Sequence, residues 1–149
     1  MKKILVLIYV SLAILIAGCS SIPMASVDTD SQAKSFIVKS DRSTIYIYRD
    51  ELFGAAIQMP VSINGKSLGK TGSKTYFSLD VPPGKYTILS SAENESTFVL
   101  QAEAGKNYFI WQEVKMGLLY ARNILQMVSD DRGKAGVNQC KLIENKENF

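Results

Sequence analysis

Histidine is absent from the 149 residues, and cysteine occurs only twice. The lack of histidine excludes histidine-ligated metal sites and every arrangement in which a histidine activates a nucleophile. No nucleophile-elbow motif occurs, and the cysteines and acids show no metal-ligand spacing. The sequence therefore predicts a protein that is not an enzyme and that uses no cofactor and no metal.

A large excess of one charge is also lacking. The chain has 17 Lys and Arg residues against 14 Asp and Glu residues, a formal net charge of +3. Two of the basic residues, Lys2 and Lys3, lie in an N-terminal segment that we expect to be removed. A chain this close to neutrality offers no basic surface for a nucleic acid. We therefore expect no nucleic-acid partner, and the composition leaves the oligomeric state open.

One long apolar run, Ile4–Gly18, lies between Met1-Lys2-Lys3 and Cys19. A positive start, a short apolar core and small residues at its end are typical of a secretory signal. The run is shorter than the roughly 20 residues that a membrane-spanning helix needs. The alternatives are an ordinary cleaved signal, an uncleaved anchor, and a lipoprotein signal peptide over residues 1–18.

The end of this run, Leu15-Ile16-Ala17-Gly18-Cys19, favours the lipoprotein signal. Small side chains admit a peptidase to the bond between Gly18 and Cys19, and the Cys19 thiolate can accept a diacylglyceryl group. The pattern resembles that of bacterial lipoprotein precursors. The resemblance implies attachment to a membrane through lipid on Cys19, and Ser20 in place of aspartate implies the outer membrane at its periplasmic face.

Lipidation of Cys19 would leave Cys140 as the one remaining thiol. An unpaired cysteine in an oxidising compartment can form an intermolecular disulfide. The other interpretation is a small buried apolar residue, which we favour because Val137 lies one helical turn before it.

The chain from Cys19 onward divides into three segments by composition and hydrophobic pattern. Residues 19–34 are small and polar without a sustained period, and they predict a flexible tether. Residues 35–143 alternate strand-like runs with turn signals, and residues 144–149 read as a frayed tail.

Strand-like runs at spacings of about 8–12 residues with Gly and Pro turns predict an all-β, mainly antiparallel sandwich or barrel. Thr75–Val81 alternates most cleanly, and Asn64-Gly65 is a type I′ turn signal. A short helix is expected from the N-cap Ser129 to about Cys140, weakened by Gly133 and Gly136. The expected strands are 36–38, 44–49, 58–63, 66–69, 75–81, 85–91, 96–103, 107–114 and 123–128, with 118–125 open between strand and helix.

The run Gly65–Thr71 superficially resembles a phosphate-binding loop. That motif needs four residues between its glycines and must open a helix. Here three residues separate Gly65 from Gly69, and a strand-like run follows. A plain hairpin is the better interpretation.

Tyrosines recur in the expected strands. Aromatic residues in strands mostly pack in the core or across strands. If several share one exposed face, they form a binding platform, for which the candidates are Tyr46, Tyr48, Arg49 and Tyr76. Arg49 is either a surface charge or a fixed contact to Asp50, Asp80 or a partner.

Four ordered stretches carry a resemblance to a known family. They are Ala33–Phe36 leading to Ile45–Arg49, Val61–Lys66 with Leu68-Gly69, Leu79–Tyr86, and Ala104–Phe109; the tail from Ile124 to Leu142 is similar too. They resemble the domain-of-unknown-function-2846 family of small proteobacterial lipoproteins and secreted proteins. The resemblance implies an immunoglobulin- or prealbumin-like β-sandwich with a short C-terminal helix, after the N-terminal signal helix, and no catalytic residues.

These observations lead to two functional hypotheses. The first is an outer-membrane lipoprotein whose β domain binds an envelope protein at an exposed strand edge, or supports the envelope. The second is a small-ligand-binding lipoprotein that uses the sandwich interior or a tyrosine-rich face.

Overall fold

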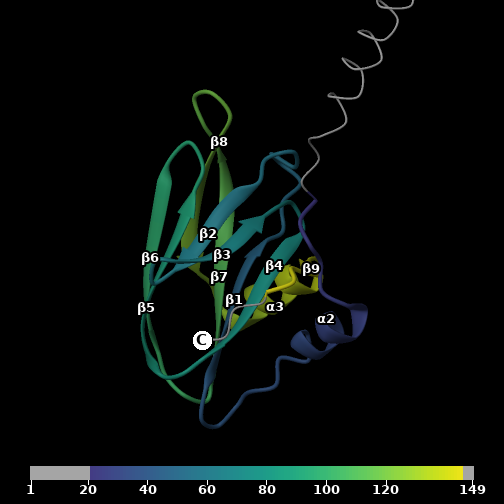
Figure 1. Ribbon diagram of the computed structural model, residues 1–149, viewed down its shortest axis with the longest axis vertical. Helices are drawn as coiled ribbons and strands as arrows, with labels where there is room; N and C mark the ends of the chain where they lie inside the picture. Colours follow the sequence, from purple (N-terminus) through teal and green to yellow (C-terminus); the bar gives the residue numbers. More distant parts are fainter. Residues whose placement is uncertain (1–20, 146–149) are drawn as a thin grey trace, which may run out of the picture.

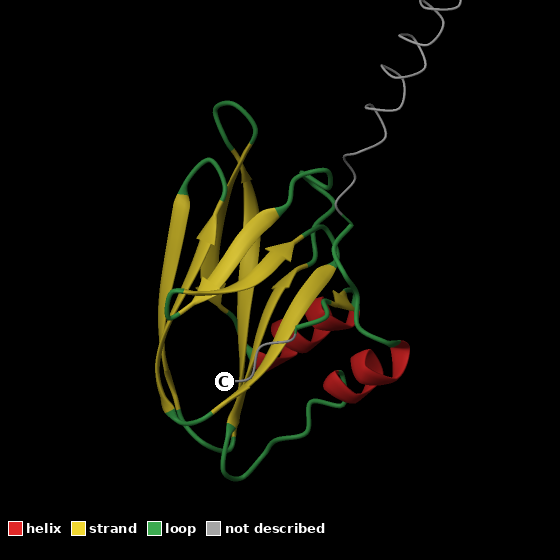
Figure 2. Cartoon of the chain, viewed as in Figure 1, coloured by secondary structure: helices red, strands yellow, loops and turns green. Residues whose placement is uncertain are grey.

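The computed structural model describes residues 21–145. The expected signal peptide, the Gly18–Cys19 bond and residues 146–149 lie outside the described residues. The described chain forms two β-sheets that face each other, with two short helices on the outer side of one of them (Figures 1 and 2). The expectation of a mostly β protein is therefore confirmed. Neither helix within residues 21–145 is long and apolar enough to cross a membrane.

The five-stranded sheet lies against the helices. Its spatial order is β8 (Ala121–Met127), β7 (Lys106–Met116), β1 (Ser43–Arg49), β4 (Thr75–Val81) and β9 (Lys141–Leu142). The four-stranded sheet has the order β3 (Lys66–Thr71), β2 (Met59–Ile63), β5 (Gly84–Ser91) and β6 (Glu95–Ala102). The helices are α2 (Val27–Ala33) and α3 (Asp130–Asn138).

Local patterns predicted the antiparallel hairpins well. The strand over Thr75–Val81 is confirmed with both of its bounds, and Phe77, Leu79 and Val81 lie in the buried cluster between the sheets. Asn64 and Gly65 have φ values of 49° and 79°, as a type I′ turn requires. They join β2 to β3, so the hairpin interpretation of the glycine-rich run is confirmed.

Two pairings in the five-stranded sheet are parallel. β1 pairs with β7, and β4 pairs with β9. Parallel neighbours need a long crossover, and the chain between β1 and β7 supplies one by building the entire four-stranded sheet and β4. The sheet is therefore mixed, and no local sequence pattern indicates this.

The weak strand expected at 36–38 is wrong. Phe36 has a φ of 51°, which a strand does not allow, and its ring packs on Tyr46 and Phe109 at centroid distances of 5.4 and 5.7 Å. The ambiguity over 118–125 resolves into a loop followed by β8.

The flexible tether expected over residues 19–34 is wrong from residue 22 onward. Helix α2 begins at the N-cap Ser26, whose Oγ accepts a hydrogen bond from the Thr29 N–H. At the other end of the helix, Lys34 donates to the carbonyl oxygen of Cys140 at 2.7 Å. Small polar residues suit a coil, but they also supply helix caps, and the contacts that fix this helix come from distant segments.

The chain just before α2 is joined to the C-terminal segment. The Ala25 N–H donates to the Leu142 carbonyl oxygen at 2.9 Å, and the Glu144 N–H donates to the Pro23 carbonyl oxygen at 2.9 Å. Met24 forms a bridge with Ile143. The first described residues therefore extend the β9 edge of the sheet.

The chain has two main apolar clusters, one on each face of the five-stranded sheet. Side chains such as Ile45, Ile47 and Phe77 fill the space between the sheets. On the other face, Tyr46, Tyr48 and Phe109 pack beneath the helices. β1 is buried along its whole length because it contributes to both clusters.

Candidate functional site

The tyrosine candidates share one face of the five-stranded sheet, but that face is covered. Tyr46, Tyr48 and Tyr76 are 2%, 0% and 0% exposed. The Tyr46 hydroxyl donates to the Ala33 carbonyl oxygen at 3.0 Å, and the Tyr76 hydroxyl contacts Asp30 Oδ1 at 2.8 Å. The interpretation that these aromatic residues pack in a core is therefore confirmed, and the alternative of an exposed platform is wrong: they are the core beneath α2 and α3.

Burial also sets the acidity of these phenols. It raises the pKa of Tyr46 to about 12, partly offset by a hydrogen bond with Ser78. Burial likewise raises the pKa of Tyr48 and that of Tyr76, and for Tyr76 the hydrogen bond to Asp30 adds to the shift. All three tyrosines stay protonated at neutral pH.

Arg49 holds a loop rather than a carboxylate or a partner. It is 0% exposed, and its guanidinium donates to the carbonyl oxygens of Ile57 at 2.6 Å, Gly54 at 2.5 Å and Phe53 at 3.2 Å. The expected alternatives, a surface charge or a fixed contact to Asp50, Asp80 or a partner, are both wrong. Burial lowers the pKa of Arg49, and the nearby charge of Glu51 acts against that shift.

A groove remains open on the helix-covered face, and we call it the outer groove. It has a volume of about 390 Å³ and lies among β1, β4, α2, the 35–42 loop and Leu142. Thr44 and Tyr46 of β1 and Ser78 and Asp80 of β4 contribute from the sheet. The remaining lining residues are Thr29, Gln32, Ala33, Ser35, Ile37, Lys39 and Leu142.

A carboxylate is fixed in the outer groove. Asp80 accepts a hydrogen bond from Thr44 at 2.8 Å and forms an ion pair with Lys39. Burial by itself raises the pKa of Asp80, but the hydrogen bonds from Lys39 and Thr44, with the charges of Lys39 and Arg42, bring the pKa below its usual value. The carboxylate is therefore a held anion and is poorly suited to donate a proton. The groove therefore combines hydroxyl groups, an ion pair and the apolar side chain of Ile37.

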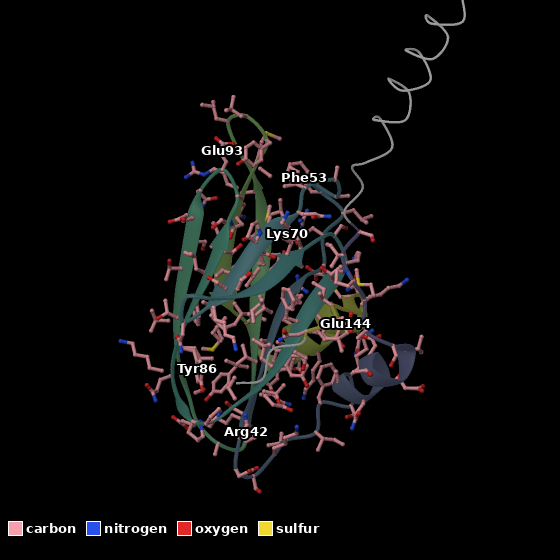
Figure 3. The ribbon with its side chains drawn as sticks, in the orientation of Figure 1. Arg42, Phe53, Lys70, Tyr86, Glu93 and Glu144 are labelled. Atoms are coloured by element: carbon pink, nitrogen blue, oxygen red, sulfur yellow. The ribbon has the colours of Figure 1, made fainter. Side chains whose placement is uncertain are left out.

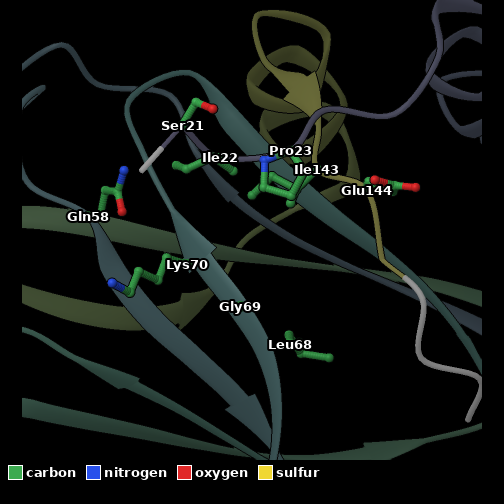
Figure 4. Close-up of a pocket in the computed structure, with 9 residues that line it drawn as sticks. All are labelled: Ser21, Ile22, Pro23, Gln58, Leu68, Gly69, Lys70, Ile143 and Glu144. Atoms are coloured by element: carbon green, nitrogen blue, oxygen red, sulfur yellow. The ribbon is translucent and has the colours of Figure 1, made fainter. Parts of the chain in front are cut away.

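A smaller pocket of about 150 Å³ lies beside the β3 edge (Figure 4). Ser21, Ile22 and Pro23 line one part of it, and Gln58 and Lys70 line another. Its volume is below the roughly 300–1,000 Å³ of typical ligand sites. The pocket matters because it includes Ser21, the first described residue after the expected lipidation site.

Both edges of the five-stranded sheet are occupied. At β8, the N–H groups of Asn123 and Leu125 donate to Asn94 Oδ1 at 2.9 Å and Ser96 Oγ at 2.8 Å. At β9, the Pro23–Ala25 segment covers the edge. A partner strand would need an edge with free backbone groups, and both edges of this sheet are covered. The five-stranded sheet therefore does not favour the hypothesis of edge pairing.

Of the candidate site residues, Tyr46 lines the outer groove, whereas the polar residues Thr44, Ser78 and Asp80 beside it were not among the candidates. Thr44 alternates with Ile45, and Ser78 and Asp80 alternate with Leu79, which places the polar residues on the face away from the core. That period-2 pattern was available in the sequence, whereas the α2 wall was not. Among residues 21–145, no group of three or more potential metal ligands occurs.

Comparison with known proteins shows the family. No solved structure matches the chain. An uncharacterized protein of Haemophilus influenzae is 31% identical over 135 residues, which cover 89% of this chain and 80% of that relative. The family described as "Protein of unknown function (DUF2846)" matches residues 39–123, more than half of the chain, from just before β1 into β8. The chain therefore belongs to the DUF2846 family.

Proposed function

We propose that this protein is a lipid-anchored outer-membrane lipoprotein whose β domain binds a partner protein in the periplasm without catalysing a reaction. The lipid is carried on Cys19, and the outer groove is the binding site. We also propose that the two sheets form an immunoglobulin- or prealbumin-like sandwich.

The observation that carries the binding proposal is the outer groove itself. It combines a fixed ion pair, Lys39–Asp80, with hydroxyl groups and an exposed apolar side chain, Ile37. An extended segment of a partner can satisfy such a lining with its backbone and one or two side chains. Because α2 forms one wall, the groove depends on the N-terminal segment that follows the anchor.

The position of the domain start supports the anchor. Ile22 packs against the core between the sheets, and Ser21 lines the small pocket (Figure 4). Only Ser20 separates Cys19 from Ser21, so the two residues lie about 7 Å apart at most. A lipid on Cys19 would therefore hold the domain directly at the membrane surface.

Site-specific photocrosslinking in intact cells tests the groove. A photoreactive residue at Gln32 or Ile37, both exposed at the groove, should capture one specific envelope protein. The same residue at Thr97, exposed on β6 of the other sheet, is the matched control. Identical products from the groove and control positions, or recovery of abundant porins alone, would contradict the proposal.

A small ligand in the same groove is the second candidate. The groove volume of about 390 Å³ falls within the range of ligand sites, whereas side chains fill the space between the sheets. Native mass spectrometry of protein purified from its own membrane should show a bound mass that is lost in Ser78→Phe, which fills the groove. An unliganded mass for wild type would leave partner binding as the better proposal.

Metabolic palmitate labelling tests the anchor separately. The wild type should be labelled and Cys19→Ser should not. Equal labelling of the two proteins would disprove lipidation at Cys19.

A further inference from the structure

Large apolar side chains are exposed at one end of the molecule, which we call the apolar end. On the β7–β8 loop, Leu118 is 90% exposed and Leu119 is 84% exposed. Figure 1 shows this loop at the top of the view, and Figure 3 places Phe53 at the same end. The apolar end consists of Leu52, Phe53, Met116, Leu118, Leu119 and Tyr120.

The tip of the β7–β8 loop is held in a fixed shape. The Glu93 carboxylate accepts hydrogen bonds from the N–H groups of Leu118 at 2.9 Å, Leu119 at 3.0 Å and Tyr120 at 3.3 Å. A Cβ at Gly117 would stand 2.2 Å from Glu93 Oε2, so any larger residue there would displace the carboxylate from its present position. The tip therefore presents apolar side chains outward while three of its backbone N–H groups already have acceptors.

This arrangement suits an interface with lipid. Backbone N–H groups without partners are costly to remove from water, and Glu93 meets that requirement within the chain. Arg122 and Lys115, which pairs with Glu113 at 2.5 Å, flank the tip in sequence and can approach anionic headgroups. Leucine and tyrosine side chains favour the boundary between acyl chains and headgroups.

The first described residues lie close to the loop that carries part of the apolar end. Ser21 lines the small pocket with Gln58, which ends the loop that carries Leu52 and Phe53. The same loop contacts β7 where Val114 donates its N–H to Glu51 Oε1 at 3.3 Å, two residues before Met116. The loop between β1 and β2 thus connects the region around Ser21, the first described residue, to the apolar end.

We infer that the apolar end inserts into the headgroup region of the same membrane that holds the lipid anchor. The inference rests on the proposed lipidation of Cys19. It assigns the protein a defined orientation, with the apolar end in the lipid and the opposite end, near Arg42 and Tyr86 in Figure 3, in the periplasm.

Tryptophan fluorescence on vesicles tests the insertion. The chain from Cys19 onward, with Trp111→Phe, is coupled at Cys19 to a maleimide phospholipid in vesicles of phosphatidylethanolamine and phosphatidylglycerol. Cys140 is 2% exposed and is shielded from coupling. Leu119→Trp reports on the tip. The matched control is Lys85→Trp, at an exposed position next to Tyr86, which Figure 3 labels at the opposite end.

Brominated acyl chains should quench Leu119→Trp several-fold more strongly than Lys85→Trp, with a blue shift at residue 119 alone. Adding Leu118→Ser should reduce the quenching at residue 119. Equal and weak quenching at both positions would overturn the inference. The apolar end would then be a surface for a protein partner rather than for lipid. Because the anchor is attached chemically, this result does not depend on whether cells lipidate Cys19, which palmitate labelling decides.

Discussion

Gly136 of α3 lies directly against the ring of Tyr48 on β1. A Cβ at Gly136 would stand 2.2 Å from Tyr48 Cε2, and a Cβ at Gly133 would stand 2.1 Å from Phe109 Cγ. Both glycines are buried at the contact between the helix and the sheet. Glycine weakens an isolated helix, but here it allows α3 to approach the sheet closely.

Gly136→Ala should therefore destabilise the protein by about 2 kcal/mol, because an added methyl group overpacks the contact with Tyr48. In a helix without this contact, the same change would stabilise by roughly 1 kcal/mol. Urea unfolding measures the difference. Asn138→Ala, at an exposed position of α3, should change stability by less than about 0.5 kcal/mol. A more stable Gly136→Ala protein would show that the contact is not tight.

Asp30 should make the stability depend on pH in the acid range. Burial by itself raises the pKa of Asp30, but hydrogen bonds from Lys34 and Tyr76, the charge of Lys34 and the Leu142 N–H together lower it below 3.8. A lowered folded pKa means that the stabilisation is complete above the unfolded value and is lost as the pH falls through the folded value. Asp30→Asn should cost about 2 kcal/mol at neutral pH and should lose less stability than wild type on acidification.

Urea midpoints between about pH 2 and pH 6 check this prediction. Asp28→Asn is the control, since Asp28 is exposed in the first turn of the same helix. Parallel pH profiles for wild type and Asp30→Asn would contradict the role of Asp30.

Glu93→Ala should loosen the β7–β8 tip without weakening the fold. The hydrogen bonds from Leu119, Leu118 and Tyr120 hold the pKa of Glu93 below its usual value, so the acceptor is ionised at neutral pH. Hydrogen exchange should become several-fold faster at these three amides, while the urea midpoint stays unchanged. Glu95→Ala, an exposed acid on β6, should leave the tip amides protected. Unchanged exchange in Glu93→Ala would mean that the tip does not depend on this carboxylate.

Cys140 should be unreactive in the folded protein. It is 2% exposed, and burial raises the pKa of its thiol to about 12, with the negative charge of Asp50 adding to the shift. Neither access nor thiolate is available to a disulfide partner at neutral pH. A thiol reagent should modify Cys140 only after unfolding, and a wild-type dimer sensitive to reducing agents would contradict this.

The sequence predicted the structural features that depend on residues close to one another in the chain, such as turns, hairpins and helix caps. Strand alternation and the Asn64-Gly65 turn identified the hairpins, and Ser129 marked the start of α3, where its Oγ accepts from the Arg132 N–H. Cys140 was also correctly expected to be buried.

The errors concern contacts between distant segments. Tyr46, Tyr48 and Tyr76 do share one face of the sheet, but nothing local showed that α2 and α3 cover that face. Arg49 could not be assigned because its acceptors are backbone carbonyl groups, which carry no sequence signature. The outer groove has no local sequence signature either, since its α2 wall comes from a segment whose composition is typical of a coil.

The pairing of Pro23–Ala25 with Leu142–Glu144 has a consequence for the order of folding. The Pro23–Ala25 segment finds its partners only when the last strand has been made. If the chain is exported and lipidated as proposed, the enzymes that modify Cys19 would meet the Pro23–Ala25 segment before it docks on the domain. On that proposal, modification of Cys19 would come before assembly of the sheet edge.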